Sequence, residues 1–123
     1  MPARKPEEVD RLLAELLSAG DLEGVVALYE PGATFVAQPG AAATGHAAIR
    51  QATAQFLAMK PTLRLQVASV TAAGDLALLV SKWTLTGTGP DGKPVTMAGT
   101  GAEVVRRQAD GTWRFVLDNP YAG

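Results

Sequence analysis

The chain of 123 residues contains no cysteine. This absence excludes disulfide bonds, thiolate nucleophiles and zinc sites built from cysteine ligands. Phosphate-binding glycine loops are also missing, because Gly87, Gly89 and Gly92 surround a predicted hairpin and do not open a helix. The sequence holds no cluster of metal ligands either. We therefore expect no cofactor, neither a metal ion nor a nucleotide.

An excess of positive charge is lacking as well. Eleven Lys and Arg residues stand against twelve Asp and Glu residues, which gives a formal net charge of -1. Basic residues gather nowhere beyond a pair such as Arg106-Arg107, which is too little charge to follow a phosphate backbone. We therefore expect no nucleic-acid partner.

Long apolar runs are absent too. No continuous apolar segment has the length of a signal-peptide core or of a membrane span, so we expect no membrane association and a cytoplasmic location. Hydrophobic residues make up 47% of the chain and charged residues 19%, which is typical of a globular protein. At this length the expectation is a single domain over residues 1–123.

Three helices are predicted in the first half of the chain. The first has apolar residues at helical spacing and ends at Gly20: Val9, Leu12, Leu13, Leu16 and Leu17. The second is short, is capped by Asp21, and has an apolar side of Leu22, Val25, Val26 and Tyr29. The third begins near His46, ends before Pro61, and presents Ile49, Ala52, Thr53, Phe56 and Leu57.

The remaining segments are predicted strands. A short strand covers residues 33–37 and is followed by a turn at Gln38-Pro39-Gly40. After Pro61, turn signals at residues 73–75, 89–92 and 109–111 separate four extended segments. The predicted fold class is therefore α+β, with a curved four-stranded antiparallel meander plus a short strand, packed against three N-terminal helices.

If each loop between these strands holds two residues, the side chains divide between the two faces of the meander as follows. One face carries Leu79, Ser81, Trp83, Thr100, Ala102, Val104, Trp113, Phe115, Leu117 and Asn119. The other carries Leu76, Leu78, Val80, Lys82, Glu103, Val105, Val116 and Asp118. A slip of one residue would exchange the faces. Because both faces are largely apolar, we expect helices on the first and a second copy of the chain on the other, which is a homodimer through the sheet.

The order of these elements resembles the SnoaL-like branch of the nuclear transport factor 2-like superfamily, which includes ketosteroid isomerase, scytalone dehydratase and limonene epoxide hydrolase. The resemblance is carried by residues 27–36, 44–50, 74–78 and 111–120. It implies a cystatin-like cone with a pocket between helices and sheet, and often a dimer through the sheet. This fold also hosts cyclases and non-catalytic association modules, so the resemblance does not name a reaction.

The catalytic residues of these relatives find few counterparts. Ketosteroid isomerase carries its aspartate base just before a proline at the end of the first strand, and here that place reads Gln38-Pro39. Glutamine cannot exchange a proton near neutral pH. The pocket histidines of scytalone dehydratase are matched only by His46, which we interpret as an exposed polar residue opening a helix. The Asp-Arg-Asp arrangement of limonene epoxide hydrolase is not evident.

Two carboxylates stand out because they lie within long strands. Ten of the twelve acids fall in helices or turns, where we expect them to be solvated. Glu103 and Asp118 are predicted to lie opposite each other on adjacent strands, where the closeness of two carboxylates raises the pKa of one of them. Either they do acid-base work, or Lys82, Arg107 or a second chain neutralises them. Asp118 is the candidate catalytic base, and one slip or bulge would turn it into the pocket, where some SnoaL-like cyclases carry such an acid.

The sequence supports two hypotheses of function. The first is a homodimer whose pocket binds a small apolar organic molecule, with cofactor-free isomerisation, cyclisation, dehydration or hydrolysis as the candidate reactions. Its candidate substrate-binding residues are Tyr29, Gln38, Phe56, Trp83, Thr100 and Asn119. The second is an association module that works through its exposed sheet. A cavity of several hundred Å³, about the usual size of a ligand site, favours the first, and a filled cone favours the second.

Overall fold

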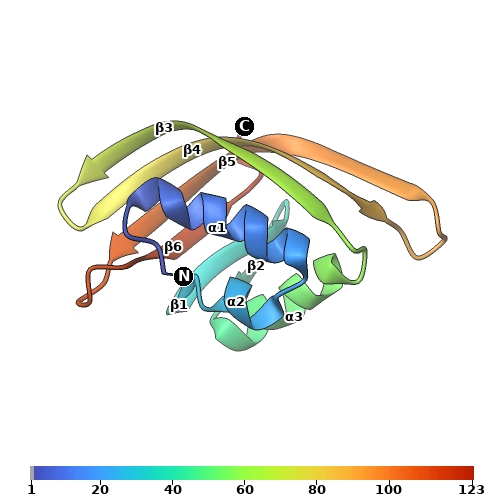
Figure 1. Ribbon diagram of the computed structural model, residues 1–123, viewed down its shortest axis with the longest axis horizontal. Coiled ribbons are helices and arrows are strands. Elements are labelled where there is room, and N and C mark those ends of the chain that lie inside the picture. Colours follow the sequence, from blue (N-terminus) through green and yellow to red (C-terminus); the bar gives the residue numbers. More distant parts are fainter. Residues whose placement is uncertain (1) are drawn as a thin grey trace.

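A computed structural model describes residues 2–123, which form three helices and six strands (Figure 1). The helices are α1 (Pro6–Ala19), α2 (Leu22–Val26) and α3 (His46–Leu57). The strands are β1 (Tyr29–Gln38), β2 (Ala41–Thr44), β3 (Thr62–Ala73), β4 (Leu76–Thr88), β5 (Pro94–Arg107) and β6 (Trp113–Asn119). The α+β class, the three helices and the meander of β3 to β6 agree with the sequence prediction.

The sheet is larger than predicted, with six strands in the order β2-β1-β6-β5-β4-β3. It is mixed, because β1 runs parallel to β6 while the other pairs are antiparallel. The predicted short strand begins earlier, at Tyr29, a residue that helical spacing assigns to the second helix. Gly40, with a φ of 78°, lets the chain reverse into the unpredicted strand β2. Helix propensity of the alanines in β2 is overridden by this pairing.

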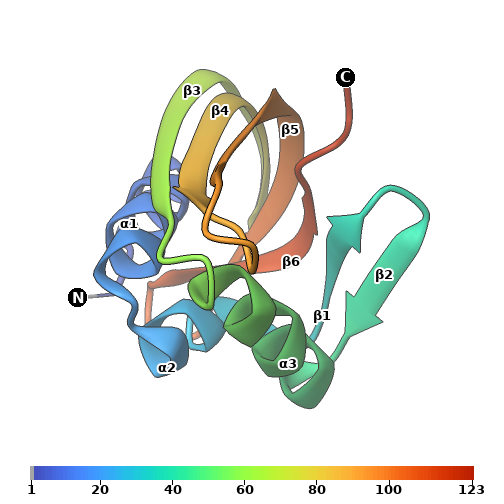
Figure 2. The same ribbon diagram turned by 90° about the vertical axis from the view of Figure 1, so that its right-hand side faces the viewer.

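The sheet curves around α1, which lies along its concave side (Figure 1). Helix α1 begins with a proline, and the Glu8 side chain accepts the backbone N–H groups of Arg4 and Lys5. It ends at Gly20 in the left-handed conformation, as predicted. Figure 2 shows α2 and α3 together at one end of this concave side, below α1 and β1. The core therefore lies between the three helices and the concave face.

The register of β5 differs from the prediction by one residue. Thr88 pairs with Pro94, so the β4–β5 loop holds five residues, 89–93, where a two-residue loop was assumed. Side chains of β4 keep their predicted face, with Leu79, Ser81 and Trp83 buried under the helices. The side chains of β5 exchange faces, because neighbours opposite one another share a face. Glu103 and Val105 point towards the helices, whereas Thr100, Ala102 and Val104 point outwards.

Strand β6 contains a bulge that divides it into two registers. Phe115 pairs with Val105, and Leu117 pairs with the adjacent Val104, so Val116 is an extra residue. Before the bulge Trp113 and Phe115 face inwards, as predicted. After it the faces are exchanged: Leu117 and Asn119 leave the helix side, and Asp118 enters it. Glu103 and Asp118 are paired opposite each other as predicted, but on the concave face and not on the outer one.

The convex face of the sheet carries apolar side chains in adjacent strands. We call these residues the outer patch: Leu76, Leu78, Val80, Val104 and Leu117. Leu78, Val104 and Leu117 form one row across three strands. Leu76, Leu78 and Leu117 are 37%, 43% and 39% exposed, and within residues 2–123 no helix covers them. None of the helices in this part of the chain is both long and apolar enough to cross a membrane.

Candidate functional site

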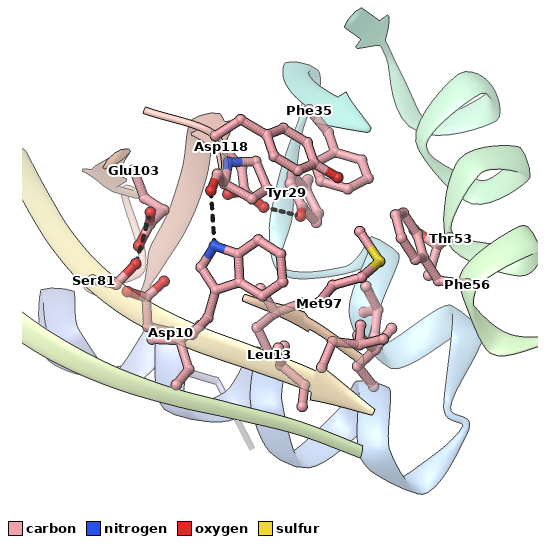
Figure 3. A pocket seen from close by; sticks show the side chains of 18 residues that line it. Asp10, Leu13, Tyr29, Phe35, Thr53, Phe56, Ser81, Met97, Glu103 and Asp118 are labelled. Atoms are coloured by element: carbon pink, nitrogen blue, oxygen red, sulfur yellow. Dashed lines mark hydrogen bonds between the residues drawn. The ribbon is translucent and has the colours of Figure 1, made fainter. Parts of the chain in front are cut away.

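A pocket lies between the helices and the concave face of the sheet (Figure 3). About 70 Å³ of it is open to the centre of a water molecule, and the space within its walls and mouth is about 670 Å³. Its walls come from α1, α2, α3 and all strands except β2. The lining residues are Asp10, Leu13, Leu17, Val25, Tyr29, Phe35, Thr53, Phe56, Leu63, Leu65, Ser81, Trp83, Leu85, Met97, Glu103, Asp118, Pro120 and Tyr121.

The pocket is polar at one end and apolar at the other. Figure 3 shows Asp10, Ser81 and Glu103 gathered at one end, with Phe56, Thr53 and Met97 at the opposite end. The three carboxyl groups that line the pocket are almost completely buried, whereas Phe56 and Met97 are partly exposed. The apolar end is therefore the mouth, and the acids lie at the closed end.

Asp118 is held by Tyr29. The Tyr29 hydroxyl donates a hydrogen bond to Asp118 Oδ2 over 2.6 Å, and Asp118 is 3% exposed. Burial, with the neighbouring Glu103 carboxyl acting in the same direction and the hydrogen bond from Tyr29 in the opposite one, raises the pKa of Asp118 to about 7. Burial and the neighbouring acid likewise raise the pKa of Tyr29, which stays a donor. Asp118 is thus a carboxyl that exchanges its proton near neutral pH.

Glu103 and Asp10 form a second group, in which each carboxyl affects the other. Ser81 Oγ donates to Glu103 Oε2 over 3.1 Å. Burial and, after it, the adjacent Asp10 carboxyl together raise the pKa of Glu103 to about 10. Burial also raises the pKa of Asp10, to about 6. The pair therefore holds one proton between its two carboxyls at neutral pH.

A glycine makes room for Glu103. A Cβ atom on Gly101 would lie 2.6 Å from Glu103 Oε2 and 2.9 Å from Ser81 Oγ, both closer than such contacts allow. Gly101 precedes Glu103 by two residues on the same face of β5, so any side chain there would displace the carboxyl. The closed end of the pocket depends on this missing methyl group.

Aromatic residues fix the rest of the wall. The Tyr29 ring packs on Phe115, with 4.8 Å between ring centroids. Trp83 Nε1 donates to the Pro120 carbonyl over 2.8 Å, and the Tyr121 hydroxyl donates to the Ala37 carbonyl over 2.8 Å. These two bonds hold the segment after β6 against the pocket.

Of the predicted substrate-binding residues, three line the pocket together with Asp118: Tyr29, Phe56 and Trp83. The other three lie elsewhere. Gln38 is exposed at the end of β1, and Thr100 is on the outer face of β5. Asn119 points away from the pocket, and its Oδ1 accepts the Tyr121 N–H over 3.1 Å. The partner of Asp118 is therefore Tyr29 and not Asn119.

Sequence reasoning missed the participation of Asp10. We expected it to be solvated with the other helical acids, yet it is 0% exposed. The signal was present, because Asp10 precedes Leu13 by three and Leu17 by seven residues and so shares their helix face. His46 opens α3 as interpreted, but it is half-buried and not exposed, and its Nε2 forms a hydrogen bond with the Tyr29 carbonyl oxygen over 2.7 Å.

The model of the SnoaL-like domain matches residues 9–116, most of the chain. The chain belongs to the SnoaL-like domain family. Its architecture, three helices on a six-stranded mixed sheet, is the nuclear transport factor 2-like, or cystatin-like, fold. The predicted resemblance is therefore confirmed. No match is found among curated proteins.

Solved structures with this fold carry varied names. A ketosteroid isomerase-like protein from Erwinia carotovora atroseptica is 17% identical, with a TM-score of 0.80, over 91% of this chain and 88% of that one. A candidate dehydratase from Streptomyces avermitilis is 19% identical, with a TM-score of 0.79, over 95% and 94%. A candidate calcium/calmodulin-dependent protein kinase II association domain from Xanthomonas campestris is 20% identical, with a TM-score of 0.79, over 95% and 84%. Identities this low show the fold alone.

The chemistry of the pocket is acidic and apolar. Among residues 2–123, no lysine, arginine or histidine lines it. Within the same part of the chain, no group of three or more histidine, cysteine or acidic side chains is arranged to hold a metal ion. The arrangement can take up and release protons and contact an apolar molecule, but it offers no positive group to an anionic one.

Proposed function

We propose that the protein binds a small, mostly apolar organic molecule and transfers a proton within it, with Asp118 as the general base. One observation carries this proposal. Two carboxyls, paired on adjacent strands, face one apolar pocket, and the pKa of one is near neutrality while that of the other is far above it. Pairs of acids whose pKa values are driven apart supply a base and an acid at the same pH.

Each residue of the pair has a distinct part in this proposal. Asp118, with a pKa of about 7, is ionised often enough to take a proton and basic enough to hold it. Tyr29 orients it through the hydroxyl group. Glu103, which stays protonated, gives a proton to the oxygen or nitrogen where negative charge develops. A proton thus leaves one atom of the ligand for Asp118 as another arrives from Glu103, and no cofactor enters the exchange.

Isomerisation, dehydration, cyclisation and hydrolysis can all use a carboxyl acid together with a carboxylate base. We therefore propose proton transfer and do not name one of these reactions. The size of the pocket limits the ligand. Ligand sites usually measure roughly 300–1,000 Å³, and only about 70 Å³ here is open to the centre of a water molecule. We therefore propose a ligand whose reacting group is small and whose remaining apolar part extends through the mouth.

The same small volume favours a second candidate function, an association module. In that case the outer patch is the working surface and the pocket is a remnant. We propose that a second copy of the chain covers this patch, because Leu76, Leu78 and Leu117 are large apolar side chains exposed side by side. A homodimer is compatible with both functions, since the patch and the pocket lie on opposite faces of the sheet.

The proposed base is tested with a small ketone, cyclopentanone, in D₂O. Proton NMR follows the exchange of its α-hydrogens, a reaction that needs only a base beside the carbon and a donor to the carbonyl oxygen. We expect Asp118→Asn to slow the exchange promoted by the protein by about two to four orders of magnitude, as is typical of a lost general base. Glu15→Gln removes an exposed acid and serves as the control. Equal rates for wild type and Asp118→Asn would refute the proposal.

A further inference from the structure

One hydroxyl group at the mouth end of the pocket has no partner in the fold. It belongs to Thr53 of α3, which lines the pocket and is only 3% exposed. Among the side chains of α3, hydrogen bonds within residues 2–123 are made by His46 and Arg50, and Thr53 makes none. A threonine within a helix often donates to the carbonyl four residues earlier. The Thr53 hydroxyl lacks this bond to Ile49 and is left to find a partner elsewhere.

The Thr53 hydroxyl is open to the pocket. Within residues 2–123 the side-chain oxygens that are both enclosed and without a partner belong to Asp10 and Glu103, and Thr53 Oγ1 is not among them. Because the rest of the fold buries Thr53 almost completely, the space left to its hydroxyl is the pocket that it lines. Figure 3 shows Thr53 beside Phe56, at the end opposite the acids.

Packing alone would favour an apolar residue at this position. Ile49, Thr53 and Phe56 follow one another at helical spacing on the inner side of α3, and Ile49 is 0% exposed. A buried hydroxyl without a hydrogen bond destabilises a fold, whereas valine has the same shape and no group to satisfy. The hydroxyl is therefore available to a bound molecule and serves no contact within the protein.

We infer that Thr53 selects the ligand, because its hydroxyl forms a hydrogen bond with an uncharged oxygen atom of the ligand that is remote from the carbon at Asp118. Tyr29 occupies Asp118 Oδ2 and leaves Oδ1 without a partner within residues 2–123. Asp118 pairs with Glu103 and so lies towards the other end of the pocket. Two separate polar contacts fix the orientation of a ligand in an apolar site.

This inference rests on the proposed function and adds a substrate class to it. The ligand is a neutral molecule with two oxygen-bearing groups, one beside the carbon that exchanges a proton and one, a hydroxyl or a carbonyl, across a short apolar chain. The apolar chain lies between Asp118 and Thr53, and the second oxygen is held just inside the mouth.

Charged groups fit the Thr53 end less well. Phe56 and Met97 lie at the same end, and among residues 2–123 no lysine, arginine or histidine lines the pocket. A carboxylate or phosphate would lose its hydration there for a single hydrogen bond. An ammonium group has three N–H donors and would find one hydroxyl acceptor. A hydroxyl or carbonyl oxygen needs only the one bond that Thr53 offers.

The volume of the pocket decides the probes. One water molecule needs roughly 10–15 Å³ measured in the same way, so about 70 Å³ holds on the order of five to seven non-hydrogen atoms. The ketones 5-hydroxy-2-pentanone and 2-hexanone both have this size. They differ in one group, a terminal hydroxyl in the first and a methyl in the second, and their flexible chain lets that group reach Thr53 while the carbonyl lies at Asp118.

The test is a titration with each ketone, followed by ¹⁵N–¹H NMR of the tryptophan indoles. Trp83 lines the pocket and Trp113 does not, so one signal reports binding and the other is an internal reference. In Thr53→Val the affinity for the hydroxyketone relative to 2-hexanone should fall about tenfold, because the buried hydroxyl of the ligand loses its partner. Thr53→Ser should keep the wild-type ratio, and so should Thr84→Val, a control on an exposed threonine of β4.

An unchanged ratio in Thr53→Val would overturn the inference, and so would a failure of both ketones to bind to the wild type. Urea unfolding checks for a structural role. The midpoint of Thr53→Val should not fall below that of the wild type, since the hydroxyl has no partner within residues 2–123. A lower midpoint would mean that the hydroxyl stabilises the fold, which contradicts the inference.

The proposed base is tested separately in the same system. Asp118→Asn should lose the exchange of the α-hydrogens of 2-hexanone in D₂O and keep the wild-type ratio of affinities. If exchange depends on Asp118 but the ratio does not depend on Thr53, only the role of Thr53 is refuted. If the ratio depends on Thr53 and the protein promotes no exchange, only the base is refuted.

Discussion

Replacing Asp118 with asparagine is expected to leave the stability of the protein almost unchanged at pH 4 and to increase it at pH 8. The carboxyl has a pKa of 3.8 in the unfolded chain and about 7 in the folded protein. Between these values the unfolded chain loses the proton first, so the free energy of unfolding falls as the pH rises. The full penalty is reached above about pH 7. It is absent below the unfolded value, where both states are protonated.

The magnitude follows from the difference between the two pKa values. About three pH units at ~1.4 kcal/mol each amount to on the order of 4 kcal/mol at pH 8. Asparagine carries no charge at either pH, and its carbonyl oxygen still accepts the hydrogen bond from Tyr29. Its NH₂ group takes the place of a carboxylate oxygen and must itself be buried, which lowers the gain in stability. We therefore expect Asp118→Asn to stabilise the protein by about 2–4 kcal/mol at pH 8.

Urea unfolding at a fixed protein concentration measures this effect, with the fluorescence of the buried Trp83 and Trp113 as the signal. For a slope of about 2 kcal/mol per molar urea, the midpoint of the variant should lie about 1–2 M above that of the wild type at pH 8 and close to it at pH 4. Glu15→Gln should show no such pH dependence. A variant less stable than the wild type at pH 8 would mean that the fold stabilises ionised Asp118, which contradicts the raised pKa.

Three further predictions concern other parts of the site and the sheet. Tyr29→Phe removes the hydrogen bond that lowers the pKa of Asp118, so that pKa should rise above about 7 in a ¹³C NMR titration; an unchanged value would contradict the assigned bond. Gly101→Ala should displace the Glu103 carboxyl and lower the midpoint of urea unfolding, since the new methyl group meets Oε2 at 2.6 Å, and an unchanged midpoint would argue against that crowding. Leu78→Lys places a charge in the outer patch and should halve the mass found by light scattering, unless the wild type is already a monomer.

Sequence periodicity predicts every element except β2, but it does not predict the faces of two strands. Helix α1 and its end at Gly20 follow from apolar spacing and from a residue that tolerates the left-handed conformation. The inward face of β4 follows from simple alternation. Beyond the β4–β5 turn, alternation depends on loop length, and residues 89–93 read equally well as a two-residue or a five-residue loop. That difference of one in register moved Glu103 from the outer face to the pocket.

The candidate site was only partly predictable for a related reason. Asp118 was identified because an acid in a long strand is unusual. The face of the sheet on which it lies depends on a bulge that no residue type in β6 predicts. Asp10 was missed because charged residues on helices are usually solvated. A partner for it inside the fold, the Glu103 carboxyl, arrives only from a strand about ninety residues later in the chain. Tertiary contacts of that kind leave no local pattern.

The extra residue in β6 also has a consequence for how such a pocket can change. If the seven residues of β6 alternated without the bulge, Leu117 would enter the pocket and Asp118 would move to the convex side. Deleting Val116, by contrast, would leave plain alternation with Phe115 and Asp118 still on the concave face. The place of one backbone irregularity thus decides on which side of the sheet the acid lies, without any substitution in the residues that line the pocket.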